Sequence, residues 1–430
     1  MSERKNKIVK VLGVSFAHFS HDSFMAFLAP ILPLLIAKFG LTYSMAALIG
    51  ISRNIPTLFN PVIGSVADRY NLKFFVILGP ALSGVFMLSM GIAPNFAVLL
   101  LLGLGAGISS AIFHIPCAPL IKKFAGNKMG FAMSIYMIGG ESARALGPII
   151  ALTVVSIFGL SGMYKVLPIC ILIAFIIFMA LRDIPYIKPT EKHSVKGSIL
   201  ETITHGKLFF IAIFGVFLTK IFTASLTGAL LPTYLVSEGH SAWMGGICLS
   251  ITQISAIFGL MFSGYLADKY GRLKILTFII ICAPLTMLGW LFAESIFTNA
   301  HIFGGDPQTT IQIVKMLFTS GWYFILSLFI FGVVAYADMP IYLSLVQSYG
   351  FKFPATANGV FFMAHFFLSS IGVFMAGRMS DILSMHTAFR IFAGISFLGI
   401  LFIPLLRKAA KRADIHAQAD ANAELIRSSR

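Results

Sequence analysis

Charge is scarce in this sequence. Only 11% of the 430 residues are charged, against about 25% in soluble globular proteins. Acidic residues are the scarcer kind, 16 against 32 basic ones, whereas 58% of the residues are hydrophobic and the mean hydropathy is +0.90. So few charges cannot cover a water-exposed surface, and we therefore predict a protein that is solvated mainly by lipid.

Several functional signatures are also missing. No stretch matches the nucleotide-binding loop G-x-x-x-x-G-K-[ST], which argues against an ATP-driven pump. The basic residues lie in short clusters between apolar segments rather than along one stripe, which argues against a nucleic-acid partner. The four cysteines lie within apolar segments at no metal-ligand spacing. We expect no enzyme activity, no cofactor and no resident metal.

What the sequence does have is long apolar runs. A helix needs roughly 20 apolar residues to cross the bilayer core, and this rule predicts twelve membrane spans. The first follows the basic start MSERKNKIVK, but it is too long for a signal peptide and lacks a small-residue cleavage site, so we expect it to stay uncleaved. The spans cover residues 8–38, 42–67, 73–93, 96–121, 129–159, 163–182, 208–236, 242–267, 273–295, 317–347, 354–378 and 384–406.

The basic residues between the spans predict the orientation. Most of the 32 Lys and Arg residues fall on the side of the membrane that holds both ends of the chain. Positively charged loops stay in the cytoplasm, so both termini are predicted to be cytoplasmic, in a bacterial inner (plasma) membrane. The loops on the other side hold only Lys38, Lys165, Lys315, Arg378 and Arg390.

A repeated motif divides the chain into two halves. The segment GSVADRYNLK begins at Gly64 and GYLADKYGRLK begins at Gly264, 200 residues later, and each follows the second of six spans. Two duplicated six-helix halves that meet around a central cavity are typical of transporters. The predicted domains are an N-terminal half at 1–182, a cytoplasmic linker at 183–207, a C-terminal half at 208–406 and a cytoplasmic tail at 407–430.

The second copy of this motif resembles the loop motif of the major facilitator superfamily, G-x-x-x-D-[RK]-x-G-R-[RK]. The resemblance implies an all-α membrane fold of twelve transmembrane helices in two pseudo-symmetric halves. A carboxylate at a helix end can face the positive N-terminus of a neighbouring helix, so we expect the motif to gate a conformational change. Its residues here are Gly264, Asp268, Lys269, Gly271 and Arg272, and the first copy, with Asn71 and Leu72 at two positions, keeps Gly64, Asp68 and Arg69.

Two further stretches resemble one branch of this superfamily. SSAIFHIPCAPL, from Ser109, and GFAMSIYMIGGESARALGPIIA, from Gly130, are similar to the fourth and fifth helices of fosmidomycin-resistance-like proteins. That branch tends to have a Phe-His-Pro element, then a Gly-Gly pair and a later Gly-Pro. Here Ile115 separates the histidine from the proline. The resemblance implies export of a small polar or anionic compound, such as a phosphonate antibiotic.

Ionisable residues occur inside several spans. The stretch AHFSHDSF places His18, His21 and Asp22 at spacing i, i+3, i+4, on one helical face. An unpaired charge at mid-bilayer costs about 2.5–3.5 kcal/mol, and the third, sixth, ninth and twelfth spans are expected to hold essentially none. The resemblance implies that the remaining spans line a cavity, where we predict that these groups meet. The others are Arg53, His114, Glu141, Arg144, Lys220, Asp338 and His365.

These residue types suggest roles in transport. Carboxylates can carry protons, imidazoles titrate near physiological pH, and guanidinium groups bind phosphate or phosphonate through two bonds. We therefore expect the carboxylates of Asp22, Glu141 and Asp338 to carry protons. The three cationic side chains are expected to attract an anionic group of the substrate: Arg53, Arg144 and Lys220. The four histidines are expected to act as hydrogen-bond partners or relays: His18, His21, His114 and His365. His114 and Asp338, each two residues before a proline, are expected to face one another across the pseudo-twofold axis.

Structural pairing of the same residues stays open as an alternative. Glu141 could pair with Arg144, and either Arg53 or Lys220 could pair with Asp22. 

The expected function is that of a proton-coupled secondary transporter, an exporter that works by alternating access. Its partners would be a small-molecule substrate, protons and the lipid bilayer, and the chain would be a monomer. One alternative is uptake of an organic anion or a metal chelate by the same scaffold. Another is transport of a transition-metal ion by His18, Asp22, His114 and His365, since imidazole and carboxylate ligands suit such ions.

Overall fold

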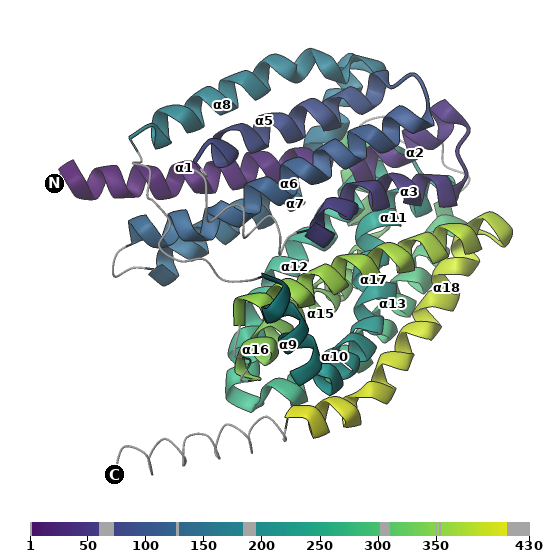
Figure 1. Cartoon of the computed structure of the whole chain (residues 1–430). Helices are drawn as coiled ribbons and strands as arrows, with labels where there is room; N and C mark the ends of the chain where they lie inside the picture. Colours follow the sequence, from purple (N-terminus) through teal and green to yellow (C-terminus); the bar gives the residue numbers. More distant parts are fainter. Residues whose placement is uncertain are drawn as a thin grey trace, which may run out of the picture.

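A computed structural model describes residues 2–59, 73–125, 129–183, 195–301, 310–349, 351 and 354–410. The regular elements among these residues are all helices (Figure 1). Eleven helical segments are long and apolar enough to cross a membrane, and each coincides with one of the predicted spans. The span predicted at 42–67 begins as α3 (Tyr43–Asn54) and the 3₁₀-helix η1 (Ile55–Phe59), and continues into residues outside the described part.

The N-terminal part of the chain forms one bundle, drawn purple to blue in Figure 1. Its first span is broken into α1 (Ser2–Met25) and α2 (Leu28–Phe39), and α2 ends at Gly40, which adopts the left-handed conformation with φ 61°. Besides α3 and η1, this N-terminal bundle contains α5 (Lys73–Ser89), η2 (Met90–Ile92), α6 (Phe96–Ala125), α7 (Met129–Phe158), η4 (Leu160–Val166) and α8 (Leu167–Leu181).

The remaining helices form a C-terminal bundle, drawn teal to yellow in Figure 1. Its first span contains a π-helical turn, η5 (Ile221–Ser225), between α10 (Lys207–Lys220) and α11 (Leu226–Ser237). The boundaries of the two halves, the linker and the tail that the sequence predicts remain predictions. The other elements are α9 (Val195–His205), α12 (Ala242–Tyr270), α13 (Arg272–His301), α14 (Thr310–Thr319), α15 (Trp322–Ala335), α16 (Met339–Ser348), α17 (Pro354–Ile382), α18 (Met385–Ile395) and η6 (Ser396–Phe402).

Glycines let the helices of the N-terminal bundle approach one another closely. A Cβ atom on Gly140 of α7 would overlap the ring of His18 in α1, and one on Gly139 would lie 2.7 Å from the carbonyl oxygen of Ser15. A Cβ on Gly107 of α6 would overlap the carbonyl group of Arg53. Small residues at these crossings therefore allow α7 and α6 to contact the helices that carry ionisable residues.

The two bundles contact one another through α17 on α3, α12 on α7, and α11 on α2. The carboxylate of Asp381, near the end of α17, accepts hydrogen bonds from the backbone N–H groups of Tyr43 (2.6 Å) and Ser44 (3.0 Å) and from the Ser44 hydroxyl. The indole N–H of Trp243 donates to the hydroxyl of Ser156 at 3.0 Å. We call this end of the molecule the closed end. The first helix, α1, begins at the opposite end (Figure 1).

Candidate functional site

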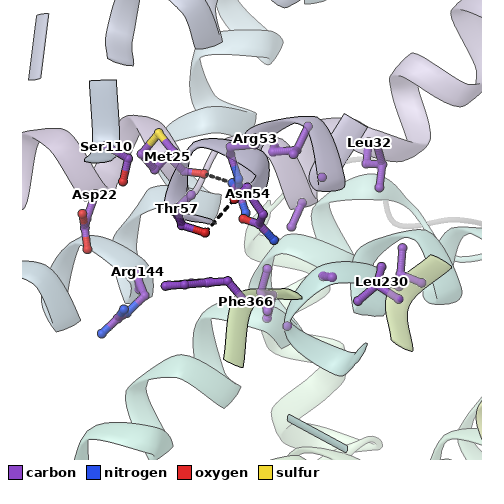
Figure 2. A pocket seen from close by; sticks show the side chains of 18 of the residues that line it. Asp22, Met25, Leu32, Arg53, Asn54, Thr57, Ser110, Arg144, Leu230 and Phe366 are labelled. Atoms are coloured by element: carbon purple, nitrogen blue, oxygen red, sulfur yellow. Dashed lines mark hydrogen bonds between the residues drawn. The ribbon is translucent and has the colours of Figure 1, made fainter. Parts of the chain in front are cut away.

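A cavity of about 510 Å³ lies between the two bundles (Figure 2). Its wall is built by α1, α2, α3, η1, α6 and α7 on one side and by α11, α12 and α17 on the other. Four of the ten predicted site residues line it: Asp22, Arg53, His114 and Arg144.

Three imidazoles surround the carboxylate of Asp22. The Nδ1 atom of His21 lies 2.9 Å from Oδ1, and the Nε2 atoms of His18 and His114 lie 3.4 Å from Oδ2 and Oδ1. The side chains of His18 and His21 are 8% and 0% exposed, whereas that of His114 is 39% exposed. His114 therefore connects the buried cluster to the cavity.

The neighbours of His18 determine which of its nitrogens faces Asp22. Nδ1 lies 2.9 Å from the backbone carbonyl oxygen of Tyr136, and the ring stacks on the Tyr136 ring with centroids 4.1 Å apart. Because a carbonyl can only accept a hydrogen bond, Nδ1 must carry a proton. The Nε2 atom, which faces the carboxylate, is therefore the atom through which His18 gains or loses a proton.

The same cluster has the composition of a metal site. One potential ligand atom from each of His18, Asp22 and His114 lies within 4.8 Å of the other two. The bond from His18 to the Tyr136 carbonyl is the kind of outer contact that orients a metal-binding histidine. His365 is not a member of this group, since its ring packs edge-on against Phe217 of α10, with centroids 4.7 Å apart.

The two guanidinium groups on the cavity wall have different partners. Arg144 forms an ion pair with Glu141, as one of the alternatives expected, and 47% of its side chain stays exposed. Arg53 donates from Nη1 to the backbone carbonyl of Met25 at 2.9 Å (Figure 2). The guanidinium group of Arg53 is therefore bonded to the backbone at the end of α1, three residues after Asp22, and not to the carboxylate of Asp22.

The remaining cation and carboxylate form a buried pair within the C-terminal bundle. Lys220 donates from Nζ to Asp338, and the two residues are only 7% and 3% exposed. Lys220 lies where the π-helical turn begins, and Asp338 lies at the break between α15 and α16. The hydroxyl of Tyr336, at the same break, donates to the carbonyl of Ala224 in the π-helical turn at 2.9 Å.

This pair corrects two predictions. The expectation that Asp338 faces His114 across the pseudo-twofold axis is wrong, because Asp338 bonds to Lys220 and His114 contacts Asp22. The alternative pairing of Lys220 with Asp22 is wrong for the same reason. Lys220 directly precedes a π-turn and Asp338 lies at a helix break, so regular helical spacing does not predict the relative placement of the residues on either side of these irregular turns.

The structure also contains a polar group in a span where none was expected. Glu294 of α13, in the ninth span, is 1% exposed and accepts hydrogen bonds from Tyr234 (2.8 Å) and Thr298 (2.6 Å). Its Oε1 lies 3.5 Å from Nε2 of His240. The expectation that the ninth span lacks such groups is therefore wrong. Asp381 was also missed, because nothing in its sequence surroundings distinguishes it from a solvated helix end.

The second copy of the loop motif lies at the junction of α12 and α13. Gly271 adopts φ 99°, a conformation that favours glycine, and Arg272 Nη1 lies 3.5 Å from the carbonyl of Ser344 in α16, within the same bundle. The other predicted members, Gly264, Asp268 and Lys269, lie in the last turns of α12. Gly64, Asp68 and Arg69 of the first copy lie outside the described residues.

Comparisons with known proteins agree with this architecture. A sequence model of the Major Facilitator Superfamily matches residues 14–305. The Fosmidomycin resistance protein of Escherichia coli is 23% identical over 401 residues, which cover 91% of this chain and 92% of that protein. The Multidrug resistance protein MdtG of Salmonella arizonae is 25% identical over 267 residues, which cover 60% of this chain and 63% of that protein.

Two solved structures share the fold. The crystal structure of the nucleoside transporter NupG matches with a TM-score of 0.67 and 17% identity, over 92% of this chain and 98% of that one. A bacterial homologue of the human lysosomal transporter Spinster matches with a TM-score of 0.66 and 15% identity, over 96% and 97%. The chain therefore belongs to the major facilitator superfamily, and it is an integral membrane transporter whose described residues form an all-α fold of two helical bundles with eleven helical segments long enough to cross the membrane.

Proposed function

We propose that the protein is a proton-coupled exporter of a small polar or anionic compound, which acts as a monomer in a bacterial inner membrane. The observation that carries the proposal is the cavity between the bundles, with Asp22, His114 and two arginines on its wall. With both termini in the cytoplasm, the closed end would face outward. Export is supported by the printed names of the relatives, which are resistance proteins.

We assign the transported proton to Asp22 and its imidazoles. This assignment is supported by the contact of one carboxylate with three imidazoles, one of which, His114, lines the cavity together with Asp22. Glu141 and Asp338, the other two predicted carriers, are assigned to hold Arg144 and Lys220 in place, because each is already paired with that cation. A substrate anion bound near Asp22 changes the free energy of ionising its carboxyl group, and this links substrate binding to proton binding.

The proposal can be tested in sealed vesicles that contain the purified protein. A pH gradient is imposed in either direction, and a panel of labelled organic anions is followed. We expect transport to reverse with the gradient in the native protein and to lose at least tenfold of its gradient response in Asp22→Asn. The matched control is Asp183→Asn, since Asp183 is an exposed carboxylate beside Arg182. An unchanged gradient response in Asp22→Asn contradicts the assignment, and movement of the anion in the same direction as the protons, rather than opposite to them, would favour uptake instead.

A second candidate, transport of a transition-metal ion, is favoured by the proximity of ligand atoms from His18, Asp22 and His114. The untagged protein would be titrated with Co²⁺, whose visible absorption reports coordination by imidazole and carboxylate. This function predicts saturable absorption that weakens at least tenfold in His114→Gln and persists in His365→Gln. An equal response in both variants, or no saturable absorption, rejects it.

A further inference from the structure

The two sides of the cavity wall differ in chemistry. Among the described residues that line it, the ionisable ones all come from the N-terminal bundle. The C-terminal bundle contributes one polar side chain, the amide of Gln253. Its other lining residues are small or apolar: Gly228, Ala229, Leu230, Leu249, Phe362, Phe366 and Val373. Figure 2 shows Asp22 and Arg53 on one side of the cavity and Leu230 and Phe366 on the other.

We infer that the substrate is an amphiphilic anion, with an acidic head group bound by the N-terminal bundle and an aromatic or alkyl body bound against α17. This inference rests on the proposed function and names its substrate class. The cavity volume of about 510 Å³ lies within the range of about 300–1,000 Å³ that is usual for pockets that bind drug-sized ligands.

The head-group side offers donors suited to a phosphonate, sulfonate or carboxylate. Arg144 keeps 47% of its side chain exposed although it is paired with Glu141, and a guanidinium group has five N–H donors. The bond from Arg53 to Met25 uses one of its five donors. An oxyanion can take two parallel bonds from such a group. A cationic amphiphile would instead meet two guanidinium groups, which disfavours it.

The body side is formed mainly by two aromatic rings of α17. Phe362 and Phe366 are four residues apart and therefore lie on one face of the helix. Both are half-buried, whereas Leu230 and Leu249 are 1% and 3% exposed and support the wall from behind. A purely polar anion would leave these rings in contact with water. An apolar body that covers them gains the free energy of burying both surfaces.

The test is a homologous series of n-alkylphosphonates, from methyl to octyl, bound to the full-length protein and measured by calorimetry. Each methylene group buried is worth about 0.8 kcal/mol, so we expect Kd to fall about fourfold per added methylene until the cavity is filled. Arg144→Gln should weaken every member of the series at least tenfold and leave this dependence unchanged. Phe366→Ala should reduce the dependence on chain length and leave the Kd of methylphosphonate unchanged.

The matched control is Phe367→Ala, because the next residue along α17 is 51% exposed and does not line the cavity. It should bind the series as the native protein does, which also controls for partitioning into detergent. Phe366→Leu offers a milder variant, with an intermediate dependence on chain length. Equal affinity for methyl- and octylphosphonate, or the same loss in Phe367→Ala, overturns the inference. The gradient-driven transport assay tests the proposed function separately, since it needs no dependence on chain length.

Discussion

Asp22 in the N-terminal bundle and Asp338 in the C-terminal bundle are both carboxylates inside a membrane span, but their surroundings differ. Asp22 contacts three imidazoles, one of them 39% exposed. Asp338 contacts a single ammonium group and is 3% exposed. Asp22 and His114 line the cavity, whereas Lys220 and Asp338 are buried against one another and are not among its lining residues. In the proposed function the N-terminal cluster would exchange protons, whereas the C-terminal pair would hold a broken helix in place.

Removing one partner of the C-terminal pair is expected to have the largest effect. Lys220→Met leaves a buried carboxylate without its cation, which costs about 3–5 kcal/mol of stability, whereas Lys220→Met with Asp338→Leu should recover most of it. The midpoint of thermal unfolding in detergent reports both. If Lys220→Met unfolds at the native temperature, the pair is not structural and the comparison between the halves fails.

A second test disturbs the imidazole cluster without changing any ionisable group. Gly140→Ala would place a methyl group in the ring of His18, and such overpacking costs about 1–3 kcal/mol. We expect a lower unfolding midpoint together with weaker gradient-driven transport. The control is Gly289→Ala in α13, where an added Cβ meets no atom within 4 Å. Equal losses in both variants would show that the close approach at His18 has no special role.

The closed end offers a smaller effect. Asp381→Ala removes a carboxylate that accepts N–H bonds across the two bundles at the start of α3. Loss of such a hydrogen bond costs about 1 kcal/mol, which is about a fivefold shift in a two-state equilibrium. Spin labels at positions 165 and 319, one on each bundle, should report a larger share of separated bundles. Asp183→Asn, which changes an exposed carboxylate beside Arg182, should leave this distance distribution unchanged. The reverse pattern would place the gate elsewhere.

The smallest effect concerns Glu238, which follows α11 at the end of a membrane span. Burial, with a further contribution from Glu294, raises the pKa of this carboxyl above its usual value. Folding therefore favours the protonated form, so the stability penalty of the ionised carboxyl is fully present above the raised pKa and is relieved as the pH falls from there to the ordinary value. Because Glu238 is partly exposed, Glu238→Gln should stabilise the protein at neutral pH by less than about 1 kcal/mol. Unfolding midpoints measured across pH would show a flatter profile; an unchanged profile contradicts this.

The membrane spans could be predicted from the sequence because hydropathy is a property of each segment by itself. The runs at 73–93 and 242–267, for example, needed no knowledge of their neighbours, and both are helices long enough to cross the bilayer. The cluster at His18, His21 and Asp22 could be anticipated for a similar reason, since a regular helix places spacings of three and four on one face.

The partners across helices could not be predicted in the same way. Which cation meets Asp338 depends on how the two helices pack against one another. Pro340 in the first turn of α16 does signal the helix break at Asp338, but the π-helical turn after Lys220 has no clear sequence signal. Glu294 was hidden for another reason. A single carboxylate at the end of an apolar span resembles a solvated terminus until its three neighbours, Tyr234, His240 and Thr298, are seen around it.

The contact between His18 and the backbone oxygen of Tyr136 has one further consequence. A carbonyl cannot accept a transferred proton, so His18 is a dead end for proton conduction rather than a link in a wire. In the proposed function, a proton would therefore reach and leave Asp22 from the cavity, which Asp22 and His114 both line, through the same opening as the cargo. Sharing one entrance would tie the two ligands to each movement of the bundles.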